Sequence, residues 1–348
     1  MVEWKKLGEV CEVIRGKRVT KGDLLENGKY PVISGGVTPM GFINSFNREP
    51  NTITVSQYGT AGYVDFQKER FWANDICYSL YPSEQLNNKY LWYVLKNKQA
   101  FLYSIRNTDA VPYSLPIDSL KKVTIPITPL SEQQRIVGIL DTFTSSIENL
   151  KEQIAQRRKQ YEYYRDQLLD LEGKEGVEMK TLGESCLIRT GSKPAEILDK
   201  GRYCYINAGT TESGYVNESN CDCDVVTTPS RGQGGIGFVG YQRNDFWLGP
   251  LCYQIRPNKK ENFKSKYLFY YLSSHSEEIL KYKSEGGTPA VNAVDLKKIQ
   301  IHLPPLQEQQ RIVSILDTLE ASIQNLEAQL SQREKQYEYY RNKLLTFE

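Results

Sequence analysis

The chain has 348 residues, of which 44 are Lys or Arg and 42 are Asp or Glu, giving a formal net charge of +2. With only two histidines, a histidine-rich metal site or a histidine-based catalytic triad is disfavoured. No apolar run is long enough to span a membrane, no signal peptide is recognisable, and the seven cysteines lack zinc-binding spacing. These features predict a cytoplasmic, multidomain protein with no metal site.

Residues 1–128 are predicted to form a first globular domain. Short runs of β-branched and aromatic residues, such as residues 53–55, alternate with Gly, Pro and Asn turns. This pattern is typical of short strands in a largely antiparallel α+β domain. Residues 90–95 predict one helix within it.

A long helix is predicted within residues 129–172. Apolar or aromatic residues recur at spacings of four and three from Ile136 to Leu168, with Arg157 in one of these positions. This is the heptad pattern of a coiled-coil seam. Ser131 followed by Gln134 predicts an N-cap with a capping box. Roughly 39 residues at 1.5 Å each would give a rod of about 58 Å.

The same plan is then repeated, as a domain over residues 173–304 and a helix over residues 305–348. The 40 residues from Leu306 align with those from Leu130 without a gap, and 27 of the 40 positions are identical. The preceding domains match more loosely, for example VEWKKLGEVCEVIRGK from residue 2 and VEMKTLGESCLIRTGSK from residue 177. The chain therefore contains an internal repeat with similar helices and diverged domains.

A glycine motif in the second domain matches the sequence of a nucleotide-binding fingerprint, but its predicted structural context does not match. Residues 232–237 read G-x-G-x-x-G, but the following residues, Phe-Val-Gly-Tyr, predict a strand where the fingerprint needs a helix. Gly59, Gly62, Gly234 and Gly237 are therefore predicted to serve hairpin turns. No catalytic constellation is found, so we expect a protein that is not an enzyme.

The connectivity predicts how the two helices pair. A seam this narrow requires a second seam, and each chain supplies two. The domain between them can join the helices if they are antiparallel, whereas a parallel pair would require it to reach back along about 58 Å. The predicted fold is α+β, with two mostly-β domains separated by two long helices in an antiparallel coiled coil with pseudo-two-fold symmetry.

At this point the residues resemble a known family. IPITPLSEQQRIVGILD and IHLPPLQEQQRIVSILD, each leading into a long helix and each preceded by a domain ending in DSLKK or DLKK, resemble the specificity (S) subunit of type I restriction-modification systems. The resemblance extends over the whole chain. It implies a non-catalytic subunit whose two target recognition domains each read half of a bipartite, asymmetric DNA site.

The resemblance also implies partners and a division of chemistry. Two methyltransferase (M) subunits would dock on the helices, which would set the spacer, and motor-nuclease (R) subunits would join them. S-adenosylmethionine would be bound by M, and ATP with Mg by R, with no cofactor in this chain. A coiled-coil scaffold or adaptor with two globular heads and no affinity for DNA is the alternative.

Candidate DNA-binding residues are polar side chains in turn-rich segments at matching places in the two domains, because such side chains read base edges and phosphates. They are Arg15, Lys17, Arg18, Gln57, Tyr58, Arg106, Asn107 and Thr108, and Arg189, Ser192, Lys193, Arg231, Gln233, Thr288 and Asn292. A solvated loop position is an equally good interpretation of any one of them.

Candidate partner-interface residues lie on the two predicted helices. They are Gln133, Gln134, Arg135 and Tyr163 in the first, and Gln309, Gln310, Arg311 and Tyr339 in the second. The tyrosines lie off the seam, and exposed tyrosine suits interfaces. Packing against the recognition domains is the alternative interpretation.

Overall fold

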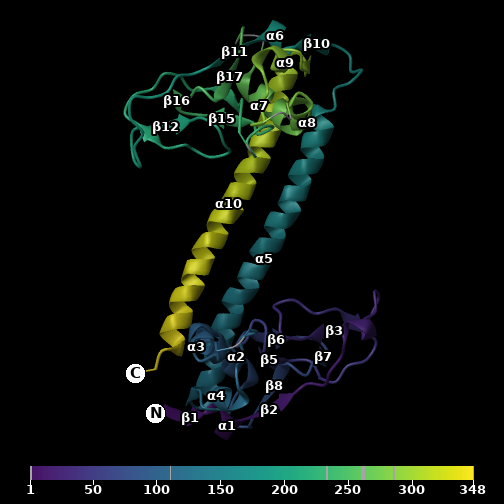
Figure 1. The fold of residues 1–348 in the computed structure, drawn as a ribbon, viewed down its shortest axis with the longest axis vertical. Helices are drawn as coiled ribbons and strands as arrows, with labels where there is room; N and C mark the ends of the chain where they lie inside the picture. Colours follow the sequence, from purple (N-terminus) through teal and green to yellow (C-terminus); the bar gives the residue numbers. More distant parts are fainter. Residues whose placement is uncertain (1, 110, 233, 260–262, 285–286, 348) are drawn as a thin grey trace. The chain divides into compact units, whose positions relative to one another are not determined.

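A computed structural model of the chain forms two compact units (Figure 1). It describes residues 2–109, 111–232, 234–259, 263–284 and 287–347. The first unit contains Met1–Lys151 and Ala328–Glu348, and the second contains Glu152–Glu327. Each unit therefore combines one globular domain with a part of each long helix. Among the described residues, no helix is both long and apolar enough to cross a membrane.

The globular domain of the first unit is built from short strands and short helices. Its strands are β1 (Glu3–Lys6), β2 (Cys11–Arg15), β3 (Tyr30–Ile33), β4 (Phe42–Ile43), β5 (Thr52–Ser56), β6 (Val64–Gln67), β7 (Trp72–Ala73), β8 (Cys77–Pro82) and β9 (Thr124–Ile127). Its helices are α1 (Leu7–Val10), the 3-10 turn η1 (Lys21–Asp23), α2 (Asn88–Asn97), α3 (Gln99–Ser104) and α4 (Ile117–Lys121). The larger hydrophobic core receives residues from β2, β5, β8 and α2. A second, smaller cluster contains Phe71, Ala73 and Cys77.

The second domain repeats these elements in the same order, except that its described residues contain no counterpart of η1. Its strands are β10 (Glu178–Thr181), β11 (Cys186–Thr190), β12 (Tyr203–Ile206), β13 (Tyr215–Val216), β14 (Val225–Pro229), β15 (Gly240–Gln242), β16 (Trp247–Leu248), β17 (Cys252–Pro257) and β18 (Gln300–Leu303). Its helices are α6 (Leu182–Ser185), α7 (Ser265–Ser274), α8 (Ser276–Leu280) and α9 (Ala293–Leu296). The fold therefore confirms the internal repeat.

The sheets of the two domains have the same topology. In the first, β2, β8, β5 and β6 form an antiparallel sheet in that order, and β4, β3 and β7 form another in which β3 and β7 are parallel. The second domain has the orders β11-β17-β14-β15 and β13-β12-β16. The predicted strands at residues 53–55 and the predicted helix at residues 90–95 are confirmed as parts of β5 and α2. The parallel pair in each domain was not predicted.

The two long helices, α5 (Leu130–Leu169) and α10 (Leu306–Leu345), pack together in antiparallel directions within each unit. In the first unit, the rings of Phe143 and Tyr340 stack with centroids 5.2 Å apart, and Lys151 Nζ lies 3.2 Å from Glu334 Oε1. Residue numbers thus rise along one helix and fall along the other. In the second unit, Arg158 and Glu327 form an ion pair at 2.6 Å. The predicted antiparallel pairing is confirmed.

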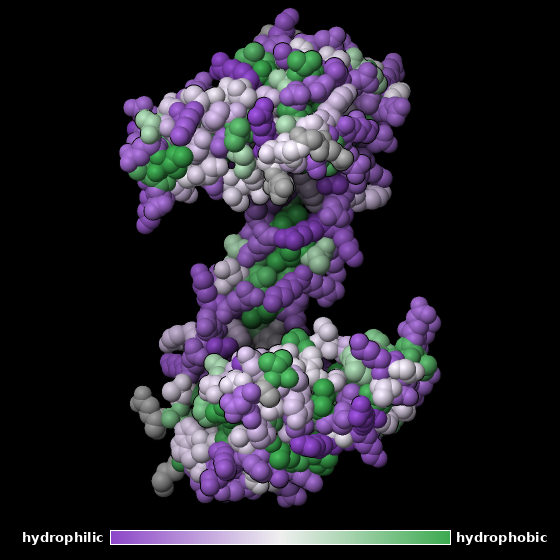
Figure 2. Space-filling model, in the orientation of Figure 1, coloured by the Kyte–Doolittle hydropathy of each residue, from purple (hydrophilic) through white to green (hydrophobic). Residues whose placement is uncertain are grey.

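The seam residues are buried mainly where the helices meet the domains. The first core includes Ile136 and Leu140 of α5 together with Leu345 of α10, and the second includes the equivalent Ile312 and Leu316 with Leu169. Away from these cores the helices expose mostly hydrophilic side chains (Figure 2). The domain cores therefore extend into both helices, so helix packing and domain folding depend on each other.

The start of the first helix differs from the prediction. The helix begins at Leu130, so Ser131 lies in its first turn and not at the N-cap. The carbonyl of Pro129 accepts hydrogen bonds from the backbone N–H of Glu132 at 2.9 Å and of Gln133 at 3.0 Å. Pro305 does the same for the second helix. The helix starts earlier than predicted because this proline carbonyl already opens the helical hydrogen-bond series.

The glycine motif of the second domain forms a loop in a hairpin, as predicted. β14 and β15 pair antiparallel on either side of it, and Gly234 and Gly237 have φ values of +83° and +90°. Side chains other than glycine are strained in this left-handed region. The motif is not followed by a helix, so it lacks the anion-binding N-terminus of a nucleotide site.

A different glycine is fixed by close backbone approach. A Cβ at Gly16 would lie 2.1 Å from the carbonyl oxygen of Ala73, and a Cβ at Gly191 would lie 1.8 Å from that of Leu248. Gly16 follows β2 and lies against β7 of the three-stranded sheet. Gly191 follows β11 and lies against β16 in the same way. Both domains therefore use glycine to join their two larger sheets.

We expect Gly16→Ala to destabilise the first domain, because the added methyl group collides with backbone that cannot move aside cheaply. Overpacking of this kind costs about 1–3 kcal/mol or more. The control is Gly138→Ala on the surface of α5, where a Cβ would meet nothing within 4 Å. Alanine there should be neutral or stabilising by up to about 1 kcal/mol. Urea unfolding measures both, and equal effects would contradict the prediction.

Candidate nucleic-acid interface and helix surface

Three of the predicted DNA-binding segments of the first domain meet at Tyr78, a buried residue of β8. The Arg15 guanidinium lies 5.8 Å from the centre of its ring. The Tyr78 hydroxyl donates to the carbonyl of Leu115 at 3.1 Å, and the Leu115 N–H donates to the carbonyl of Gln57 at 2.8 Å. The end of β2, the loop after β5 and the loop before α4 are thus held together.

The side chains that this arrangement exposes are those of Tyr58 and its neighbours. Tyr58 and Asn107 each form a β-bridge with Ser114, which aligns the two loops. Gln57 is only 5% exposed, so its side chain is buried. The exposed side chain of this loop is that of Tyr58. Arg106 is half-buried, and its guanidinium lies 4.8 Å from the Tyr103 ring and 5.4 Å from the Tyr113 ring.

Lys17 and Arg18 have exposed side chains, and hydrogen bonds hold the backbone of this segment in place. The Lys17 N–H donates to the carbonyl of Ala73 at 2.9 Å, and the Trp72 indole N–H donates to the carbonyl of Lys17 at 2.8 Å. The backbone of this segment is therefore anchored while its two cationic side chains remain free to reach an anionic partner.

The second domain places its candidates in the same way. The Tyr253 hydroxyl donates to the carbonyl of Val291 at 3.2 Å, and the Val291 N–H donates to the carbonyl of Ser230 at 2.9 Å. The exposed Arg231 forms a β-bridge with Ala290 and takes the place that Tyr58 has in the first domain. The backbone carbonyl of Ser192 accepts a hydrogen bond from the Trp247 indole N–H. The carbonyl of Lys17 accepts the equivalent bond from Trp72 in the first domain.

Some residues predicted to occupy matching places do not. Thr190 is opposite Tyr253 as Arg15 is opposite Tyr78, so the exposed Arg189 lies one position earlier than Arg15. The β-bridge that Asn107 forms with Ser114 corresponds in the second domain to the bridge between Ser284 and Ala290. Ser284 is therefore the equivalent of Asn107, in place of the predicted Thr288 or Asn292. The remaining candidates Thr108, Lys193, Thr288 and Asn292 are exposed, and Gln233 lies outside the described residues. Loops of unequal length explain the shifts of Thr288 and Asn292. Arg189 is displaced for another reason, because β2 and β11 have equal lengths and their gapless match pairs Arg15 with Thr190.

The structure gives the helix candidates Gln133 and Gln309 an internal role. Both are 0% exposed. The Gln133 amide accepts from the Asn87 N–H at 2.7 Å and donates to the Thr128 carbonyl at 2.7 Å. The Gln309 amide accepts from the Lys264 N–H at 3.0 Å. Each glutamine thus joins the long helix to the start of the short helix of its domain, α2 or α7.

The neighbouring candidates lie at the surface. Gln134, Arg135, Gln310 and Arg311 are exposed. Arg135 is paired with Glu132 at 2.7 Å, and its hydrogen bonds lower the pKa of that carboxyl. Arg311 and Glu308 form the equivalent pair. Tyr163 and Tyr339 are 58% and 60% exposed, whereas Tyr161 of the same cluster packs against the second core.

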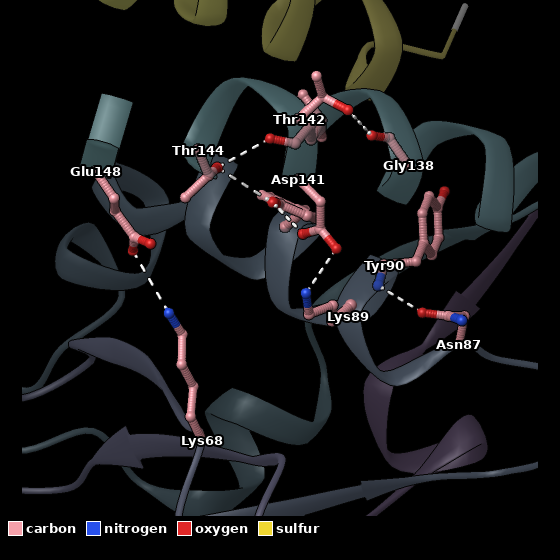
Figure 3. A network of polar contacts seen from close by, with 11 residues as sticks. Lys68, Asn87, Lys89, Tyr90, Gly138, Asp141, Thr142, Thr144 and Glu148 are labelled. Atoms are coloured by element: carbon pink, nitrogen blue, oxygen red, sulfur yellow. Dashed lines mark hydrogen bonds and ion pairs between the residues drawn. The ribbon is translucent and has the colours of Figure 1, made fainter. Parts of the chain in front are cut away.

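A second attachment of each domain to its helix was not predicted from the sequence. Asp141 of α5 accepts a hydrogen bond from the Tyr93 hydroxyl at 2.7 Å. It also forms an ion pair with Lys89 at 2.6 Å (Figure 3). Asp317 of α10 does the same with Tyr270 at 2.6 Å and Lys266 at 2.5 Å. Burial is the main cause that raises the pKa of both tyrosines, so each remains a protonated donor. The repeated Lys-Tyr-Leu-x-Tyr, whose second tyrosine is Tyr93 or Tyr270, and the repeated aspartate are the sequence signal for it.

The comparison with protein families decides what these paired domains are. Residues 1–157 and 174–334 each match the family model described as type I restriction modification DNA specificity domain. The chain belongs to this family. Its two matches correspond to the two halves of the internal repeat, so the duplicated plan is a duplicated specificity domain.

Relatives over the full length agree with this membership. A Haemophilus influenzae protein named as a type I restriction enzyme specificity subunit is 30% identical, over 99% of this chain and 96% of its own length. The Escherichia coli EcoR124I/EcoR124II specificity subunit is 29% identical, over 99% and 94%. The crystal structure of the S subunit from M. genitalium has the same fold, with a TM-score of 0.78 at 23% identity over 100% and 97%.

We expect Gln133→Leu to lower the free energy of unfolding of the first unit by about 2–4 kcal/mol. The substitution keeps the side-chain volume but removes the hydrogen-bond partner of the Asn87 N–H and of the Gln85 and buried Thr128 carbonyl groups in this specificity domain. The matched control is the adjacent Gln134→Leu, which is exposed and should change the value by less than about 0.5 kcal/mol. Chemical denaturation followed by circular dichroism checks this, and a small effect at Gln133 would refute the internal role.

Proposed function

We propose that this chain is the non-catalytic subunit that gives a type I restriction-modification enzyme its DNA sequence specificity. Each domain would read one half of a bipartite, asymmetric site. The observation that carries the proposal is the duplicated specificity domain, in which the same scaffold presents different exposed side chains, such as Tyr58 in one half and Arg231 in the other. Different side chains on one scaffold are what two different half-sites require.

Charge supports DNA as the partner of the domains. Residues 1–130 carry a net charge of +4 and residues 173–306 carry +2, whereas the two helical segments carry −2 each. Phosphate contacts supply much of the affinity of such interfaces, and base contacts supply the specificity. The fixed backbone below Lys17 and Arg18 suits a phosphate contact, because the cationic side chains start from a rigid platform.

The long helices would then hold two M subunits and set the spacer between the half-sites. Their sequences are nearly identical, and each carries the exposed residues Gln134, Arg135 and Tyr163 or their equivalents. In this proposal S-adenosylmethionine is bound by M, and ATP with Mg is bound by R.

Methylome sequencing of cells that express this chain with its M subunit tests the proposal. One bipartite motif that disappears when the chain is deleted is expected, and the absence of any motif would refute it.

We predict that lengthening both helices lengthens the unread spacer. Four residues inserted near Glu152 and the matching four near Ala328 add about 6 Å to each helix, which corresponds to roughly two base pairs at about 3.4 Å each. The methylated motif should keep both half-sites and gain those base pairs. Exchange of residues 1–128 for the equivalent domain of another family member serves as the control, because it should change one half-site and leave the spacer alone.

We also predict that Lys17→Ala and Arg18→Ala weaken DNA binding through phosphate contacts. Each should reduce the slope of log K against log salt by about 1 and lower affinity for all sequences alike. Arg231→Ala should instead relax the preference at one base pair of the second half-site. Fluorescence anisotropy with the cognate duplex and a scrambled duplex separates the two effects. An unchanged salt slope in both lysine and arginine variants would exclude a phosphate role for this segment.

A further inference from the structure

One arginine of the first domain is held in a fixed orientation beside the loops that carry the exposed DNA-binding candidates. The Arg106 guanidinium lies 4.8 Å from the centre of the Tyr103 ring and 5.4 Å from that of the Tyr113 ring. Its Nε–H donates to the carbonyl of Tyr103 at 2.7 Å. Guanidinium groups stack favourably on aromatic rings within about 6 Å. Three contacts therefore restrain a side chain that would otherwise sample many rotamers.

The two tyrosines are anchored on either side of the arginine. Tyr103 belongs to α3. Tyr113 precedes Ser114, which exchanges two backbone hydrogen bonds with Asn107, at 2.7 Å and 3.1 Å. The segment that carries the guanidinium is thus joined to the segment that carries the second ring. The side-chain entropy of the arginine is lost when the domain folds, so less remains to be lost when a partner binds.

The free edge of this guanidinium has the chemistry of a base reader. Because its Nε is used within the domain, the two terminal nitrogens remain, and neither has a hydrogen-bond partner among the residues that the structure describes. Two parallel N–H donors match the O6 and N7 acceptors of guanine in the major groove. The neighbouring Asn107 differs, because its Oδ1 already accepts the Asp109 N–H at 2.8 Å. Its amide therefore lacks the free acceptor that adenine recognition requires.

The second domain has another arrangement at the equivalent place. The β-bridges of the two domains put Lys283 where the first domain has Arg106, and they put Leu280 and Pro289 where it has the two tyrosines. A lysine offers a compact charge with rotatable donors, and neither neighbour provides an aromatic face to hold it. Of the two equivalent places, only that of the first domain thus has an oriented pair of donors, as expected of a group that distinguishes one half-site from the other.

We propose that Arg106 reads a guanine in the half-site of the first domain by donating from its two terminal nitrogens to O6 and N7, with Tyr103 and Tyr113 as positioning residues. This inference rests on the proposed function and assigns one base pair of one half-site. A phosphate also accepts two N–H donors, but a phosphate contact requires charge and no fixed orientation. The exposed side chains of Lys17 and Arg18 suit that contact better.

Methylome sequencing of cells that express the chain with its M subunit tests this assignment, and the exchange of residues 1–128 identifies the half-site that the first domain reads. In that half-site we expect one G·C pair that Arg106→Ala and Arg106→Lys both relax. A bidentate contact discriminates against other bases by roughly 5- to 150-fold. Arg106→Lys decides between the two contacts, because lysine keeps the charge that binds a phosphate and loses the paired donors. An unchanged second half-site shows that the variants still fold and assemble.

Variants of the second ring test the positioning role. Tyr113→Leu should relax the same base pair by a smaller factor, whereas Tyr113→Phe keeps the aromatic face and should leave the motif as it is. Lys17→Ala is the control for a phosphate contact, because it should weaken methylation of all sites alike without changing the motif.

Three outcomes would overturn the inference and leave the proposed function intact. The first is a motif that no Arg106 variant changes. The second is relaxation at an A·T pair. The third is an equal loss of affinity for all sequences in Arg106→Ala, with the slope of log K against log salt reduced by about 1, because that result identifies a phosphate contact. A wild-type chain that directs no bipartite motif would overturn the proposed function itself.

Discussion

The attachment of each recognition domain to its long helix is the interaction on which the rest of the structure depends. A fully buried glutamine, Gln133 or Gln309, replaces the water that would otherwise solvate the backbone at the start of α2 or α7. A tyrosine and a lysine then bind one aspartate two turns further along the helix. Buried polar groups with all partners in place allow one arrangement and penalise every other. Domain and helix are therefore one folding unit.

This attachment explains why similar helices carry dissimilar domains. The groups that join them are the glutamine amide, the Tyr93 and Tyr270 hydroxyls and the aspartates. The Tyr78 and Tyr253 hydroxyls donate instead to backbone carbonyl groups of the neighbouring loops, and every residue has such a carbonyl whatever its side chain. The exposed side chains of those loops can consequently change without disturbing the attachment. The proposed reading of two different half-sites would require this separation of attachment from exposed loop surface within each domain.

The parts of the fold that the sequence predicted are those governed by period and connectivity. The heptad spacing from Ile136 to Leu168 indicated a narrow seam, and the intervening domain made antiparallel pairing the simpler solution. The helix start was predicted wrongly, because the preference of Ser131 for an N-cap is worth only about 1 kcal/mol and the preceding proline carbonyl opened the helix first. Gln133 was predicted as a partner-interface residue, with packing against the recognition domain as the alternative, because the sequence does not show which of two adjacent glutamines faces the domain.

The candidate DNA-reading residues were harder to predict for a related reason. Arg15 and Arg189 occupy similar places in the sequence, but strand register puts Thr190 where the first domain has Arg15. A one-residue difference reverses the side of the sheet to which a side chain points. In the loops, Asn107 corresponds to Ser284, because each bridges to the strand-like segment that Tyr78 or Tyr253 holds. Tertiary hydrogen bonds therefore decide which loop residues are equivalent, and these bonds join positions more than thirty residues apart that no local pattern reveals.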